Sequence, residues 1–210
     1  MEMENQNEKV VEIKSDFTPI ERYKTLINAR NFHYDNYNKW MTYFYVAIGA
    51  LFVGYYTLIT SSYQKLDSEI FLLILLGYIV SLLWFLSAKG YYFWNINFIT
   101  LVNDCEVKDL KLKPNRRVYY VFANKKTENN YLNPISGANV STSKVSILFS
   151  YLITIIWGFL LLQKIFETDS FYLIVISGIS TLFISFCLGK ILKSKIDHFP
   201  DLHLDQGKIR

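Results

Sequence analysis

The sequence predicts an all-α membrane protein with four transmembrane helices, from its apolar runs and from the distribution of positive charge. Runs without any Asp, Glu, His or Arg cover residues 40–60, 70–88, 145–162 and 171–192. As helices, they match a hydrocarbon core about 30 Å thick. Twenty of the 22 Lys and Arg residues lie on one side of these runs. Because positive charge stays in the cytoplasm, both termini and the middle loop are predicted to be cytosolic, an N-in/C-in topology.

The first helix is predicted to begin in the cytosol and to continue into the membrane. Residues 1–18 are polar and acidic and are predicted to form a disordered cytosolic tail. Thr18, Pro19 and Glu21 then form the pattern of a capping box. No further Gly or Pro interrupts the cytosolic part, so one helix is expected over residues 19–60. Its cytosolic part is amphipathic, with an apolar stripe of Ile20, Tyr23, Ile27, Tyr34 and Met41.

The second helix is also predicted to extend beyond its span, over residues 70–106. Lys89 and the aromatic residues that follow it are typical of a membrane interface, and helical periodicity continues beyond them. The first two helices are therefore expected to extend into the cytosol. The third and fourth spans are predicted at residues 143–162 and 171–192, followed by a cytosolic tail over residues 193–210.

Residues 107–142 break the helical pattern. Pro114 and Asn129 begin turn signals, and residues 117–122 read as a short strand rich in β-branched and aromatic residues. A small hairpin and an irregular loop both fit this pattern. The cytosolic loop is basic, and the cations around the strand include Arg116, Arg117, Lys125 and Lys126. We expect it to contact lipid headgroups or a protein partner. Direct nucleic-acid binding is not expected, because no RNA-binding signature is present.

Two spans carry stripes of small residues at intervals of four. The stripes comprise Ser146, Ser150, Thr154 and Gly158 in the third span, and Ser177, Thr181, Ser185 and Gly189 in the fourth. Residues at this spacing stay close to one face of a helix, and small side chains there let two backbones approach. We interpret the stripes as helix-packing positions. The alternative is that one stripe lines a pore in an oligomer, although uncharged hydroxyls would make a weakly selective lining.

The sequence contains no motif that predicts catalysis, a cofactor or a metal centre. It has no P-loop, no dinucleotide-binding fingerprint, no nucleophile elbow and no Cys-x-x-Cys pair. His198 and His203 in the tail match no metal-ligand spacing. Arg30 and His33 have two residues between them, whereas HEPN nucleases have four between their Arg and His. We therefore predict that the protein is not an enzyme.

Several stretches of the sequence resemble the RipA-type octameric membrane proteins of bacteria. The polar helix before the first span carries the motif Arg30-x-Phe32-His33, and aromatic-rich spans follow it in a fixed order. The similar residues are 28–34, 42–44, 48–50 and 54–55 in the first helix, 82–86, 93–94 and 102–106 in the second, and 143–145 and Trp157 in the third.

This resemblance implies an oligomeric accessory protein of the bacterial inner membrane. The family includes small membrane proteins encoded beside the RNA-guided RNase of type VI-B CRISPR systems. The implied function is to modulate that antiviral defence, by forming a pore or otherwise perturbing the membrane. The implied partners are the lipid bilayer, further copies of the chain up to an octamer, and functionally the RNase. The alternative is an envelope or stress-response scaffold of the same family without a CRISPR role.

Overall fold

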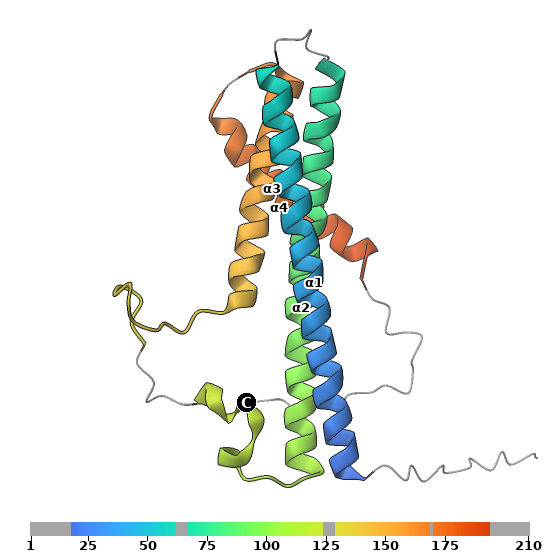
Figure 1. Ribbon diagram of the computed structural model, residues 1–210, viewed down its shortest axis with the longest axis vertical. Coiled ribbons are helices and arrows are strands. Elements are labelled where there is room, and N and C mark those ends of the chain that lie inside the picture. Colours follow the sequence, from blue (N-terminus) through green and yellow to red (C-terminus); the bar gives the residue numbers. More distant parts are fainter. Residues whose placement is uncertain (1–17, 62–66, 124–128, 169, 194–210) are drawn as a thin grey trace, which may run out of the picture. The chain divides into compact units, whose positions relative to one another are not determined.

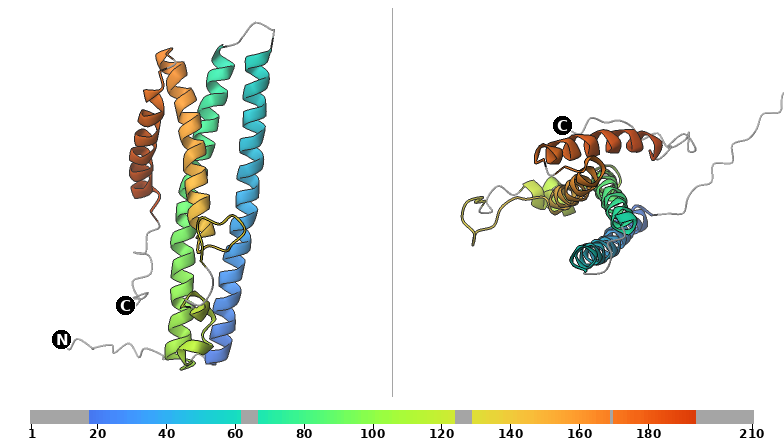
Figure 2. Two further views of the ribbon diagram at one scale, coloured as in Figure 1. Left: turned by 90° about the vertical axis from the view of Figure 1, so that its left-hand side faces the viewer. Right: turned by 90° about the horizontal axis from the view of Figure 1, so that it is seen from above.

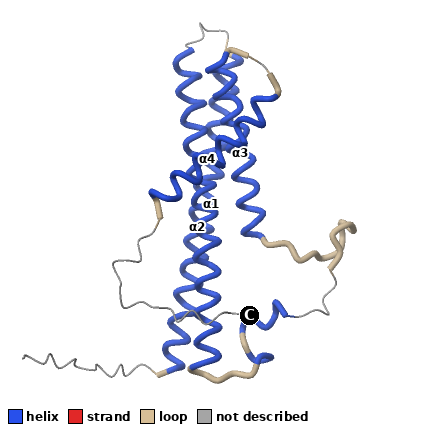
Figure 3. The backbone as a smooth tube through the Cα atoms, turned by 180° about the vertical axis from the view of Figure 1, so that it is seen from behind, coloured by secondary structure: helices blue, strands red, loops and turns tan. Residues whose placement is uncertain are grey.

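The computed structural model describes residues 18–61, 67–123, 129–168 and 170–193. The four long helices are α1 (Pro19–Thr60), α2 (Asp67–Lys108), α3 (Thr142–Phe166) and α4 (Tyr172–Ile191). Two short 3-10 helices, η1 (Pro114–Arg116) and η2 (Val118–Ala123), lie between α2 and α3 (Figure 1). The described residues contain no strand (Figure 3). Each of these four helices has the length and the apolar composition needed to cross a membrane, so the predicted all-α fold with four spans is confirmed.

The long helices begin and end close to the predicted residues. α1 has the predicted bounds, whereas α2 begins at Asp67, three residues earlier than expected, and α3 continues four residues further, to Phe166. The added turns contain polar residues next to the apolar runs, at positions 67–69 in α2 and 163–164 in α3, so a search for apolar runs stops before them. Asp67 lies at the positive end of the α2 dipole and accepts from Lys164 Nζ of α3 at 2.8 Å.

The predicted cap of α1 is present, and α3 is capped as well. The backbone N–H of Thr18 donates to Glu21 Oε2 at 2.9 Å, and the N–H of Glu21 donates to Thr18 Oγ1 at 3.3 Å. This reciprocal capping box satisfies two backbone donors at the start of α1. Ser141 caps α3, because its side chain accepts from the N–H of Lys144 at 3.4 Å.

The chain divides into two compact units. Among the described residues, the polar unit comprises residues 18–35 and 94–123, which are the start of α1, the end of α2 and both 3-10 helices. The span unit comprises the other described residues and contains all four apolar runs. Within the span unit, α4 and α1 lie on opposite sides of the helix bundle (Figure 2).

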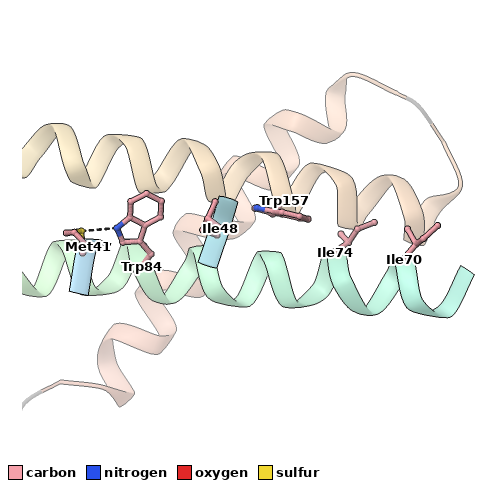
Figure 4. Close-up of a cluster of buried hydrophobic side chains, with 6 residues drawn as sticks. All are labelled: Met41, Ile48, Ile70, Ile74, Trp84 and Trp157. Atoms are coloured by element: carbon pink, nitrogen blue, oxygen red, sulfur yellow. Dashed lines mark hydrogen bonds between the residues drawn. The ribbon is translucent and has the colours of Figure 1, made fainter. Parts of the chain in front are cut away.

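Three helices contribute to the hydrophobic core of the span unit (Figure 4). Trp84 of α2 and Trp157 of α3 are fully buried, and the indole N–H of Trp84 donates to the Met41 sulfur of α1 at 2.9 Å. Phe52 of α1 packs on Trp157, with ring centroids 4.6 Å apart. Gly77 of α2 makes room for Trp157, because a Cβ at this position would overlap the indole ring. The remaining buried members of the cluster are Ile48, Ile70 and Ile74.

The predicted strand at residues 117–122 is wrong, because Val118–Ala123 forms the 3-10 helix η2. The described part of the chain offers no strand with which it could pair. The N–H of Val118, the first residue of η2, instead donates to the side-chain carboxylate of Glu106 in α2. Residues three apart lie on the same side of a 3-10 helix, and the rings of Tyr119 and Phe122 stack there with centroids 5.7 Å apart. The described part of the loop is therefore neither a hairpin nor wholly irregular.

Candidate functional site

The polar unit is organised around Glu106, whose side chain is fully buried near the end of α2. Its Oε1 accepts two hydrogen bonds of 2.9 Å, one from the Tyr23 hydroxyl of α1 and one from the backbone N–H of Val118 in η2. Its Oε2 is buried and has no hydrogen-bond partner among the described residues. Burying a carboxylate is costly unless hydrogen bonds compensate. Glu106 therefore joins three segments that are distant in sequence.

The chain reverses direction after α2 and so returns to this carboxylate. The N–H of Leu112 donates to the Glu106 carbonyl at 2.9 Å, just after Lys111 takes a left-handed conformation with φ 51°. The Arg117 side chain then donates from Nε to the Leu112 carbonyl at 3.2 Å. These local bonds place Val118 against Glu106, although the two residues lie on different elements.

Burial and hydrogen bonding keep the phenol of Tyr23 protonated. Burial, and then the hydrogen bond to Glu106, raise the pKa of Tyr23 to about 12. Burial also raises the pKa of Tyr119, which the Arg30 charge partly offsets. Burial and the neighbouring Asp109 raise the pKa of the Cys105 thiol. Tyr23, Tyr119 and Cys105 are therefore neutral at physiological pH, and Tyr23 remains a hydrogen-bond donor.

Arg30 makes a second link between α1 and η2. Its guanidinium carbon lies 5.7 Å from the centre of the Tyr34 ring and 5.9 Å from that of Tyr119. Its Nη1 donates to Asn31 Oδ1 at 3.2 Å, while its Nε is buried without a hydrogen-bond partner among the described residues. Cation–π contacts of this kind contribute about 0.5–2 kcal/mol. Arg30 therefore supports the same arrangement as Glu106.

The other two residues of the Arg30-x-Phe32-His33 motif have different surroundings. The His33 ring lies against Phe98 of α2, with centroids 5.2 Å apart. The Phe32 side chain is 68 % exposed. The motif therefore does not form one cluster in the polar unit, since each of its residues has its own environment.

The described residues include only part of the basic loop. The Arg117 guanidinium bonds to backbone, and Arg116 is exposed at the end of η1. Lys125 and Lys126 lie outside the described residues. Five and six residues after Arg116, η2 exposes two large apolar side chains, Val121 at 66 % and Phe122 at 75 %. The described part of the loop thus combines positive charge with exposed apolar surface.

The small-residue stripe of α3 lies inside the span unit. Ser150 and Thr154 are buried, and their hydroxyls donate to carbonyls of their own helix, at 2.9 Å from Ser150 to Ser146 and 2.8 Å from Thr154 to Ser150. The Ser146 hydroxyl is 2.8 Å from that of Tyr37 in α1. A Cβ at Gly158 would overlap the Ser177 hydroxyl of α4. These four positions therefore line helix contacts within one chain.

Most of the α4 stripe is also turned inward. The Ser177 hydroxyl donates to the Ile155 carbonyl of α3 at 2.9 Å, and the Thr181 hydroxyl is 3.3 Å from that of Tyr78 in α2. Ser185 is buried as well. Gly189 differs, because it is exposed and a Cβ there would meet nothing within 4 Å. Among the described residues the Ser185 hydroxyl has no hydrogen-bond partner, whereas the other stripe hydroxyls are bonded inside the protomer and do not form an open polar lining.

The described residues contain no group of three or more His, Cys, Asp and Glu side chains that could hold a metal ion. His198 and His203 lie outside these residues. In the polar unit, the buried groups are hydrogen-bonded or stacked in ways that connect segments. The arrangement is suited to fixing the position of η2 relative to α1 and α2.

The sequence contained one signal for the Glu106 site. Val102 is fully buried, and Glu106 follows it by one helical turn on the same face of α2. A carboxylate on an otherwise apolar stripe requires a buried partner. The identities of the partners, Tyr23 and Val118, could not be deduced from spacing, because they lie on separate elements.

Comparison with known proteins identifies one family. The model of the octameric membrane protein family matches residues 20–166 of the chain. The matched region includes α1, α2, α3 and the Glu106 site. No curated protein and no solved structure matches the chain.

Proposed function

Because this chain belongs to the octameric membrane protein family, we propose that it is a homo-oligomeric accessory protein of the bacterial inner membrane that modulates an RNA-guided antiviral defence. It is a multi-pass protein in a family of oligomeric membrane proteins. In the proposed role it carries out no reaction of its own. It acts through assembly, through a protein contact on its polar unit, and through perturbation of the membrane, with pore formation as the specific form.

The observation that carries the proposal is the surface presented by η2. Glu106 and Arg30 fix η2 on the polar unit, and η2 exposes Val121 and Phe122, which follow the exposed Arg116 by five and six residues in sequence. Exposed apolar side chains beside charge are typical of a protein-binding surface. The rigid attachment means that little conformational entropy is lost when a partner binds.

The proposed orientation places this surface in the cytosol. Twenty of 22 Lys and Arg residues lie on the side of the spans that carries both termini and the loop between α2 and α3. By the positive-inside rule this side is cytoplasmic. An RNA-guided RNase of a type VI-B CRISPR system would meet the polar unit there.

A phage-interference assay tests the proposal. Cells that carry the nuclease and a phage-targeting guide are compared with and without this protein, by plaque counts. We expect the protein to change interference only when the nuclease is present. Phe122→Ser should abolish the change, whereas Tyr131→Ser should retain it, because Tyr131 is also exposed, at 67 %, but belongs to the span unit.

Three results would contradict the proposal or one part of it. A change in phage resistance or envelope stress that persists without the nuclease would favour the general scaffold of the same family. Purified protein that leaves dye inside liposomes at high protein-to-lipid ratio would remove the membrane-perturbation part. A variant of Phe122 that behaves as wild type would show that η2 is not the contact surface.

A further inference from the structure

The span of α1 is less apolar than the other three spans, yet the other helices of the chain bury little of it. Contact with lipid does not explain this combination. Its most apolar stretch is the least apolar of the four spans, yet only 6 % of that stretch is buried, against 39 % in α2. The surface that meets acyl chains should be the most apolar one, because polar groups in hydrocarbon cost several kcal/mol. The outer face of α1 is therefore better suited to protein than to lipid.

This outer face forms a continuous seam. Its exposed residues alternate at intervals of four and three, which gives the 3.5-residue repeat of helices that pack side by side. The seam comprises Thr42, Val46, Gly49, Val53, Tyr56 and Thr60. Val46 and Val53 are 67 % and 68 % exposed.

Apart from Tyr56, the seam consists of small or β-branched residues, and the hydroxyls of its two threonines are bonded within α1. The Thr42 hydroxyl donates to the Asn38 carbonyl at 3.0 Å, and the Thr60 hydroxyl donates to the Tyr56 carbonyl at 2.8 Å. Between them, a Cβ at Gly49 would meet nothing within 4 Å. Small residues let a second helix approach closely in a membrane.

Other glycines of the span unit show what such a position does in this chain. Gly77 makes room for the Trp157 ring, and Gly158 makes room for Ser177. Each of these two glycines lies where a side chain of another helix comes close to the backbone. Gly49, like Gly90 and Gly189, has no such neighbour among the described residues, so its backbone is open to a side chain from a second chain.

A complementary surface lies between α3 and α4. It is an open groove of 620 Å³ with a nearly wholly apolar lining, and its floor contains Gly178. Large branched side chains form its edges, including Ile156 at 42 % exposure, Val175 at 58 % and Ile179 at 64 %. Large side chains in one helix pair and small ones in the facing helix interdigitate well.

We propose that the α1 seam of one copy packs into the α3–α4 groove of the next copy. A closed ring needs two different complementary surfaces on each chain, because contacts between identical patches stop at a dimer. The helices α1 and α4 lie on opposite sides of the bundle, as such a ring requires (Figure 2), and the seam residues are on the exposed face of α1. This inference rests on the proposed assembly, and it names the surfaces that form it.

Disulfide cross-linking tests the pairing of the two surfaces. Val53 lies seven residues before the end of the first apolar run, and Ile179 lies eight residues after the start of the fourth, so they occupy similar depths. Two differently tagged chains are co-expressed, one with Val53→Cys and one with Ile179→Cys, both with the exposed Cys187 replaced by Ser. Oxidation in membranes should join the two tags. A link between Val53→Cys chains alone, or no link in an intact oligomer, would overturn the proposal.

A bulky substitution in the seam provides a second test of the proposed interface. Gly49→Leu should abolish the oligomer peak in native mass measurements, while its helix content is retained because Leu is the better helix former. Gly189→Leu is the matched control, since Gly189 is equally open but lies on α4 outside the groove. It should assemble as wild type. An oligomer that survives Gly49→Leu would overturn this inference alone, whereas a monomeric wild type would overturn the proposed assembly as well.

Discussion

Replacing Glu106 with alanine should detach η2 from the helices of the polar unit. The substitution removes the acceptor of two 2.9 Å hydrogen bonds, from the Tyr23 hydroxyl and the Val118 N–H. Each buried donor left without a partner costs about 1–3 kcal/mol. Because water can reach both groups once η2 moves away, we expect a loss near the lower end, about 2 kcal/mol in total.

Hydrogen exchange in nanodiscs measures this loss at Val118. A free energy of about 2 kcal/mol corresponds to about a 30-fold fall in amide protection. Glu106→Gln is the control, because its amide oxygen can still accept both bonds, and it should retain most of the protection. Unchanged protection at Val118 in Glu106→Ala would refute the view that this carboxylate holds η2 in place.

Three further predictions concern single side chains. Tyr23 should ionise near pH 12. Its hydrogen bond to the Glu106 carboxylate should therefore stabilise the fold fully below pH 10 and be lost as the pH rises through 12. An absorbance titration that shows the same tyrosinate steps in wild type and Tyr23→Phe would contradict this. Ser150→Ala should cost no more than about 0.6 kcal/mol, because its hydroxyl bonds only to its own helix, whereas Ser150→Leu should unfold the protein at lower denaturant concentration. Gly77→Ala should lower the free energy of unfolding by about 1–3 kcal/mol, because the new Cβ displaces Trp157. Gly90→Ala is the control and should leave that free energy unchanged, because a Cβ there meets nothing within 4 Å. Equal melting temperatures for the two variants would refute the packing argument.

The helices could be predicted because their signals are local. Apolar length located the four spans, and the Thr18–Glu21 capping box located the start of α1. The error at residues 117–122 came from a local signal that the tertiary structure overrides. Val and Tyr favour strands only where a sheet lets them pack, and here the Glu106 carboxylate receives the first N–H of a 3-10 turn instead.

The site could be predicted only in part, because its contacts join distant segments. Glu106 and Tyr23 are 83 residues apart in sequence, and no periodicity relates them. The Arg30-x-Phe32-His33 motif marked the correct helix but not the separate environments of its three residues. The small-residue stripes indicated close packing, yet their spacing could not show that Gly189 lies exposed while Ser185 is buried.

The most direct test of this account is the native mass of the wild-type protein extracted with its surrounding lipid. A homo-oligomer assembled through α1 should give a mass that is a whole multiple of 24.7 kDa, with eight copies as the family leads us to expect. The Gly49→Leu protein should then give the mass of one chain in the same extraction. A single-chain mass for the wild type, in lipid and at every concentration, would contradict the account.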